Sequence, residues 1–200
     1  MMRLANPLSG LLAAPKRVFV DDRAAQIAEF AVSLPLLVVF VVGIFDFSGA
    51  LSLKQKLTNA AREGARVAAS DPADDLSNAS ALPVSVADAF YVVDNYLLSE
   101  QINDCALSGA KPARTTGLTW VSTATGCPTV TSNGIVLTIN RGFLTPQTID
   151  AALTDVVSTQ VTIQYAYKWR FNSVITVLVP GATYASVSYI TTAATVFNEN

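Results

Sequence analysis

The chain has no histidine, and only 14% of its 200 residues are charged. Histidine is the commonest general base and the commonest metal ligand, so its absence removes the usual centre of catalytic and metal sites. A net charge of −2 provides no positive field that would attract nucleic acid. The chain carries no phosphate-binding glycine loop, and its acidic group Asp71, Asp74 and Asp75 lacks the spacing of a calcium-binding loop. We therefore expect a protein that is not an enzyme and that has no cofactor, no resident metal and no nucleic-acid partner.

An apolar run without a single charge extends from Phe30 to Phe45, and Glu29 stands directly before it. At 1.5 Å per residue this run measures roughly 24 Å as a helix, and its uncharged flanks extend it to the thickness of a bilayer. The positive mean hydropathy of the whole chain, +0.41, is concentrated here. The sequence thus predicts a transmembrane helix over residues 25–50. Glu29 is a functional candidate, because ionisable residues in membrane segments are costly.

The helix is predicted to continue beyond the membrane. Apolar residues recur at helical spacing over residues 51–70, with charged residues between them, until Asp71-Pro72 ends the pattern. A second helix is expected from Ser85, which with Asp88 fits a capping-box pattern.

The rest of the chain is predicted to form strands. Apolar and polar residues alternate strictly over residues 157–170, with Val157, Val161 and Ile163 on the apolar side. A second alternation over residues 185–197 places Tyr189 and Phe197 on the apolar face. Shorter candidates lie at residues 118–123 and 135–139. We expect an α+β fold in which the long N-terminal helix packs on a small domain, residues 71–200, with one further helix and an antiparallel sheet wetted on one side.

The orientation in the membrane is not decided by charge, because as many lysines and arginines precede the span as closely follow it. Cys105 and Cys127 lie 22 positions apart in a loop-rich region, which favours a disulfide in an oxidising compartment. The alternative is a pair of buried, unpaired thiols. A disulfide places the domain outside the cytoplasm.

Four short motifs occur in order in the first third of the chain. They are AQIAEFA at residues 25–31, LPLL at 34–37, GIFDF at 43–47 and NAAREGAR at 59–66. Together they resemble the TadE-like family, which are minor pilins or pseudopilins of the tight-adherence (Tad) branch of the type IV pilus machinery.

The resemblance implies a processing step and a set of partners. Residues 1–24 would be a leader that a prepilin peptidase removes between Ala24 and Ala25, which makes Glu29 the fifth residue of the mature chain. Family members usually have glycine before the cut, where this chain has Ala24. The resemblance also implies a single-pass protein of the bacterial inner membrane, with its C-terminal domain extracytoplasmic, that reaches the pilus fibre or remains at its base. Its partners would be other pilin subunits and proteins of the Tad assembly platform.

Each candidate site residue has a functional and a structural interpretation. Glu29 either pairs with the N-terminal amine of a neighbouring subunit or lies solvated among lipid headgroups. Asp46, near the outer end of the span, either pairs with a partner subunit or contacts water at the interface. The helix motif, namely Asn59, Arg62, Glu63, Gly64 and Arg66, either contacts a neighbour or is a solvated face, and Gly64 suggests a close approach of another backbone.

The expected function is structural, as a minor pilin or pseudopilin in the assembly of a Tad-type pilus used for adhesion and surface colonisation. One alternative is a permanently membrane-anchored extracytoplasmic binding module. A hydrolase carried on a stalk is a third interpretation, which we do not favour because no catalytic constellation is recognisable.

Overall fold

The computed structural model describes residues 22–78, 81–127, 134–149, 152–169, 171 and 187–199. The leader before Asp22 and most of the apolar segment that follows Phe171 therefore lie outside the described residues. By its internal contacts the chain divides into two units, Met1–Val38 and Val39–Asn200. In the first unit, every described residue is part of helix α1 (Asp22–Ser70), and the described side chains are exposed. The predicted long N-terminal helix is thus confirmed.

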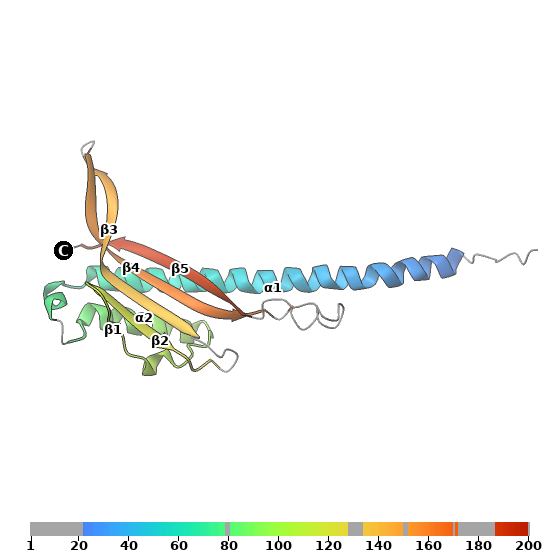
Figure 1. Ribbon diagram of the computed structural model, residues 1–200, viewed down its shortest axis with the longest axis horizontal. Coiled ribbons are helices and arrows are strands. Elements are labelled where there is room, and N and C mark those ends of the chain that lie inside the picture. The colour runs from blue at the N-terminus through green and yellow to red at the C-terminus, as the bar shows by residue number, and fades with distance from the viewer. Residues whose placement is uncertain are drawn as a thin grey trace, which may run out of the picture. The chain divides into compact units, whose positions relative to one another are not determined.

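In the second unit, α1 packs on a small folded domain (Figure 1). Its inner face is built mainly from alanine, and fully buried positions are Leu57, Ala60, Ala61, Ala65 and Ala68. Side chains this small let neighbouring elements approach the helix backbone closely. Gly64 marks the tightest point: a Cβ atom there would lie 2.6 Å from Val93 Cγ2 and 3.8 Å from Val161 Cγ1. Here α1 lies between a second helix and the sheet.

The second helix, α2 (Val84–Ser99), buries the stripe Val86, Phe90, Val93 and Leu97. The predicted capping box at its start is wrong. Pro83 precedes the helix without a side-chain cap, and Ser85 is buried inside the first turn. The Val84 N–H instead donates to Asp75 Oδ2 at 2.6 Å. Asp75 belongs to the short 3-10 helix η1 (Asp74–Ser77), and a second one, η2 (Leu107–Gly109), follows α2.

Five antiparallel strands form one sheet in the order β1-β2-β3-β4-β5. Their bounds are β1 Ala113–Arg114, β2 Thr119–Ala124, β3 Ile135–Ile149, β4 Ala152–Lys168 and β5 Val187–Phe197. The pairing of β3 with β4 shifts register between Asn140 and Phe143. Beyond that shift, the far ends of the two strands leave the rest of the sheet as a hairpin (Figure 1). One further helix and an antiparallel sheet agree with the predicted α+β class.

The alternation predicted for β4 is correct at Thr159, Val161 and Ile163, and the one predicted for β5 is inverted. At the start of the predicted alternation Val157 is 48% exposed and Ser158 is buried, because this part of β4 adjoins the register shift with β3. Val161 and Ile163 are fully buried against the helices. In β5, Thr192 and Ala194 are buried, while Tyr189 and Phe197 are 45% and 44% exposed. The cause is the register: Val161 pairs with Ala194, and directly opposite residues share a face of the sheet. Strand pairing thus overrides the hydrophobicity of single side chains.

Candidate functional site

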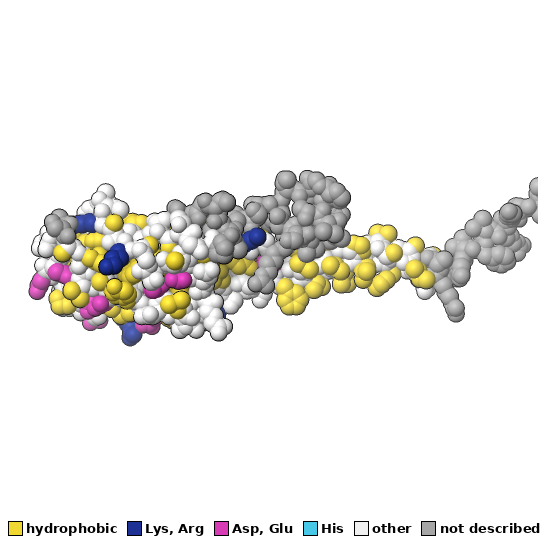
Figure 2. All heavy atoms as spheres, turned by 90° about the horizontal axis from the view of Figure 1, so that it is seen from below, with side chains coloured by type: hydrophobic (Ala, Val, Ile, Leu, Met, Phe, Trp, Pro, Cys, Tyr) yellow, Lys and Arg dark blue, Asp and Glu magenta, His cyan; other side chains and the backbone are white. Residues whose placement is uncertain are grey.

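The N-terminal part of α1 exposes large apolar side chains on all sides. Phe30, Val32 and Leu36 in the first unit are exposed, as are Phe40 and Ile44 in the second. Figure 2 shows hydrophobic side chains along the visible face of this part of the helix. α1 is long and apolar enough to cross a membrane, and none of its most apolar window is buried in the structure. Such an exposed apolar surface fits single-pass membrane anchoring.

Glu29 and Ala25 lie on this exposed helix. Among the described residues, no hydrogen bond or ion pair of Glu29 is found. Ala24 belongs to α1, but its side chain is not described. The processing and docking roles of these residues stay predictions.

Asp46 has an environment quite different from that of Glu29. It is only 6% exposed, and both of its carboxylate oxygens accept hydrogen bonds from the same chain. The Tyr167 hydroxyl donates to Asp46 Oδ1 at 3.0 Å and also lies 3.2 Å from the Asp46 carbonyl oxygen. The Phe171 N–H donates to Oδ2 at 2.8 Å. The carboxylate therefore ties α1 to the end of β4, a role that sequence reasoning missed because Tyr167 lies far along the chain.

Aromatic rings surround this contact. The Trp169 ring centroid is 5.3 Å from that of Phe47 and 5.1 Å from that of Tyr167. The Trp169 indole N–H donates to Ser188 Oγ at 2.8 Å, which links the ring to β5. Gly49 leaves room for the tyrosine, since a Cβ atom there would lie 3.2 Å from the Tyr167 hydroxyl oxygen. We call Phe47, Tyr167 and Trp169 the aromatic cluster.

The helix motif presents its polar residues to solvent. Asn59, Arg62 and Arg66 are exposed. Arg66 pairs with Glu63 at 2.8 Å, one turn back along the helix. No such partner is found for Arg62 among the described residues. The motif thus has a buried side at Gly64 and a charged side that is free to meet another molecule.

A buried arginine of β3 ties the sheet to the residue that follows α1. Arg141 is only 1% exposed and donates to Thr159 Oγ1 and to the Asp71 carbonyl oxygen, both at 3.0 Å. Thr159 in turn donates to Asn198 Oδ1 at 2.6 Å, which joins the residue after β5 to the same network. Burial lowers the pKa of Arg141, while the charges of Asp71 and Asp75 oppose that shift. Arg141 lies an even number of residues from the buried Ile135, Leu137 and Ile139 of β3 and therefore faces the same side of the sheet. This spacing is the sequence signal that its side chain points inward.

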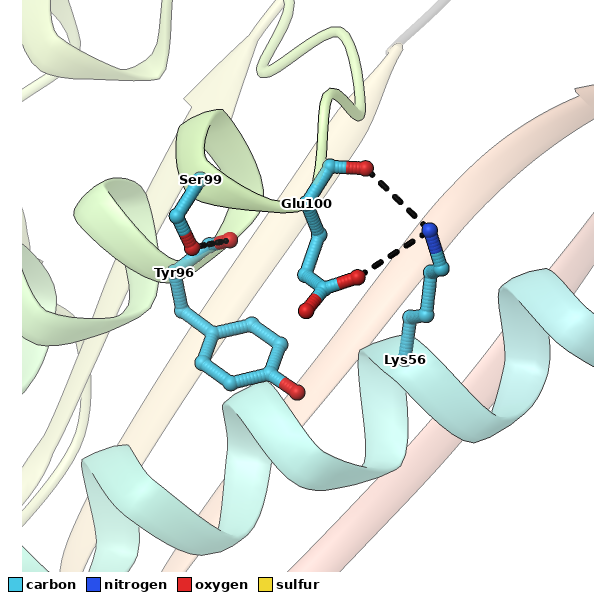
Figure 3. A network of polar contacts seen from close by, with 4 residues as sticks. All are labelled: Lys56, Tyr96, Ser99 and Glu100. Carbon is cyan, nitrogen blue, oxygen red and sulfur yellow. Dashed lines mark hydrogen bonds and ion pairs between the residues drawn. The ribbon is translucent and has the colours of Figure 1, made fainter.

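A surface contact joins α1 to the end of α2 (Figure 3). Lys56 Nζ lies 3.0 Å from Glu100 Oε2 and donates to the Glu100 carbonyl oxygen at 3.2 Å. The ammonium group thereby satisfies a carbonyl at the C-terminal end of a helix, where the helix dipole favours a positive charge. Because both side chains are partly exposed, the ion pair itself contributes little stability.

Asp94 of α2 and Asp104 form a pair of neighbouring carboxyl groups. Asp94 is 5% exposed, and its Oδ1 has no hydrogen-bond partner among the described residues. Burial raises the pKa of Asp94, and the neighbouring Asp104 raises it further. The pKa of Tyr165 is also raised, first by burial and then by Asp104, and its hydroxyl donates to the Asn103 carbonyl oxygen at 3.0 Å.

The predicted disulfide between Cys105 and Cys127 is confirmed. Both cysteines are buried, and they connect the segment before η2 to the end of β2. Gly134 leaves the room that the bridge needs, because a Cβ atom there would lie 2.6 Å from Cys105 Sγ. The disulfide therefore crosslinks the segments that precede β1 and follow β2 in the sequence.

The comparison with protein families identifies one part of the chain. Residues 24–66 match the model of the TadE-like proteins. The match lies entirely on α1 and includes Glu29, Asp46 and the Asn59-to-Arg66 motif. No curated protein and no solved structure matches the chain significantly. The match covers part of α1 alone, and the sheet domain lies outside the matched region.

Proposed function

We propose that this chain is a TadE-like minor pilin or pseudopilin, inserted in the inner membrane, that takes part in assembling a Tad-type pilus used for adhesion and surface colonisation. The observation that carries the proposal is the two-part character of α1 within the TadE-like segment. The helix is uncharged and largely exposed from Phe30 to Phe45, and one face of it is buried in a folded domain from Leu57 onward. This division suits a subunit anchored by one helix and recognised through its domain. Its role would be structural and not enzymatic.

Processing would create the group that Glu29 needs. Cleavage between Ala24 and Ala25 by a prepilin peptidase leaves a positively charged amine four residues before Glu29. A carboxylate in a membrane is stabilised by a partner of opposite charge, and the amine of a neighbouring subunit can supply one. Glu29 is exposed and makes no ion pair among the described residues, which supports an intermolecular partner.

The disulfide supports an extracytoplasmic domain. Cys105 and Cys127 are bonded, and disulfides persist in oxidising compartments such as the bacterial periplasm. The domain after α1 would then lie outside the cytoplasm, where it can meet other pilin subunits and the assembly platform. The exposed side of the helix motif, with Asn59 and Arg62, is the surface that we propose for such contacts.

The decisive experiment is the N-terminal sequence of the protein isolated from membranes. A mature chain that begins at Ala25 supports processing as a pilin. A chain that retains Met1 in membranes with assembled pili instead supports the permanently anchored binding module, an alternative favoured by Ala24 in the place of the usual glycine.

Substitution of Glu29 tests the docking role separately. Glu29→Ala is expected to abolish incorporation into the pilus assembly, measured by co-isolation with pilus components, while the protein still enters the membrane. Asp88→Ala is the matched control, because it removes an exposed helix carboxylate on α2, outside the matched segment and outside the helix motif. Equal incorporation of both variants would exclude the proposed pairing of Glu29.

A further inference from the structure

Asp46 fixes the depth of the second unit in a bilayer. It is the only charged residue between Phe30 and Leu53. A carboxylate at mid-membrane costs roughly 2.5–3.5 kcal/mol, so the inserted helix places Asp46 at the edge of the hydrocarbon region. This step depends on the membrane insertion proposed above.

The hydrogen bonds of Asp46 place the end of β4 at the same depth in the bilayer as the carboxylate. The Tyr167 hydroxyl lies 3.0 Å from Asp46 Oδ1, so the end of β4 lies at the same level as the carboxylate. Trp169 follows two residues later and contacts Phe47. Phe45 and Phe47 on α1 are 73% and 60% exposed. Aromatic side chains from two elements are therefore gathered at one depth.

The composition of this region suits lipid headgroups. Tryptophan and tyrosine are enriched at both membrane–water interfaces, because their rings have an apolar body and a polar edge. Lys168 lies between the two aromatic residues and is exposed, and a lysine at this level can extend its ammonium group to lipid phosphates. A hollow of about 730 Å³ between α1 and the end of β4 is lined in part by Phe45, Lys168 and Trp169.

We propose that the end of β4 is a membrane-contacting surface. Tyr167, Lys168 and Trp169, with Phe45 and Phe47 of α1, lie in the headgroup region of the leaflet from which α1 emerges, and the ligand is phospholipid. The Asp46 carboxylate is the positioning group that holds this surface against the helix. The sheet domain is then seated on the bilayer and does not swing freely at the end of α1.

The two tryptophans of the chain make the proposal measurable. Trp120 is only 2% exposed and belongs to the core, so Trp120→Phe leaves Trp169 as the single emitter. The full-length variant is reconstituted in vesicles of phosphatidylethanolamine and phosphatidylglycerol that contain lipids brominated near the headgroup or deep in the acyl chain. We expect a blue-shifted emission that the shallow bromine quenches more strongly than the deep one. If Trp120→Phe does not fold, the difference between wild type and Trp169→Phe reports the same signal.

Two further variants test the lysine. Lys168→Glu places a negative charge against the phosphates and should reduce the quenching by the shallow bromine. Lys111→Glu makes the same change at another exposed lysine, outside this surface, and should leave the quenching unchanged.

Flotation of the vesicles separates the two proposals. If the protein floats with the vesicles but Trp169 is quenched by aqueous iodide and not by either brominated lipid, the membrane-contacting surface is refuted while insertion stands. Quenching of Trp169 by neither reagent in floated vesicles also refutes it and indicates that protein covers the surface. If the protein does not float, insertion itself is refuted, and this inference is refuted with it.

Discussion

Replacing Gly64 by alanine tests the packing that joins the TadE-like segment to the domain. The added Cβ would lie 2.6 Å from Val93 Cγ2 and 3.4 Å from the Ala89 carbonyl oxygen. Carbon atoms pack at about 3.5–4.0 Å, so α2 would have to move by roughly an ångström. Val93 cannot rotate away easily, because a β-branched side chain in a helix has one strongly preferred rotamer.

The expected change in the free energy of unfolding is the sum of two opposing contributions. Overpacking of a well-packed core costs about 1–3 kcal/mol, whereas alanine is more favourable than glycine inside a helix by about 1 kcal/mol. Gly64→Ala is therefore expected to lower the free energy of unfolding by up to about 2 kcal/mol. Gly43→Ala is the matched control on the same helix, because no atom of the described residues lies within 4 Å of its Cβ position.

A double-mutant cycle isolates the clash. Val93→Ala alone removes two methyl groups from a fully buried site and should cost roughly 2 kcal/mol. In that background the contact is gone, so Gly64→Ala should become neutral or stabilising by up to about 1 kcal/mol. The expected coupling energy is on the order of 1–3 kcal/mol.

The measurement is urea unfolding of the full chain in detergent micelles, followed by near-ultraviolet circular dichroism. Equal effects of Gly64→Ala with valine and with alanine at position 93 would show that the two helices do not meet as described. A destabilisation by Gly43→Ala as large as that by Gly64→Ala would show that a general property of α1, and not the contact with α2, sets the result.

Three further predictions concern the domain. Removing the disulfide with the double substitution of Cys105 and Cys127 by alanine should lower the free energy of unfolding by roughly 3 kcal/mol, and reducing agent should then have no further effect on the urea midpoint. Because the folded protein raises the pKa of Asp94, this group contributes stability that is fully present below its ordinary pKa and is lost as the pH rises through the raised value. Asp94→Asn should flatten that decline in midpoints measured across pH, and Asp74→Asn, at an exposed position, should not. Asp46→Ala removes the buried carboxylate that accepts from the Tyr167 hydroxyl and the Phe171 N–H and should cost about 1–3 kcal/mol, whereas Asp46→Asn, which keeps one acceptor oxygen, should cost less in the same urea assay.

The elements that the sequence predicts well are those defined by local periodicity. The apolar stretch before Asp46 and the alanine-rich stretch after Leu57 together predict α1, and strict alternation predicts β4. The alanine-rich stretch and the strand show this periodicity because an element that buries one face must repeat its apolar residues at the period of the backbone, whereas the stretch before Asp46 is recognised by its uninterrupted apolar length. The family resemblance also rests on α1 alone, where local motifs suffice.

The predictions that are wrong or incomplete concern features that depend on contacts with residues distant in the sequence. Pairing with β4 inverts the face expected for β5. Ser85 fits a capping pattern, but Asp75 from the preceding segment satisfies the start of α2. β3 continues well past Ile139 because it pairs with β4 beyond the register shift, a contact that its polar, proline-containing second half does not reveal. The parity of Arg141 on β3 indicates an inward side chain but not its partners, and the bond between Tyr167 and Asp46 has no local signature.

Asp46 and Glu29, two carboxylates of the matched segment, therefore differ in how much each would gain from a partner on another subunit. Asp46 receives hydrogen bonds from Tyr167 and Phe171 on both oxygens, so an external partner would have to break contacts already made. Glu29 has no hydrogen bond or ion pair among the described residues, and it lies next to the most apolar part of the chain. A charge in that position gains most from a partner supplied by another subunit. Of the two, Glu29 is the residue whose loss should impair assembly, while loss of Asp46 should act through the seating of the domain on its own helix.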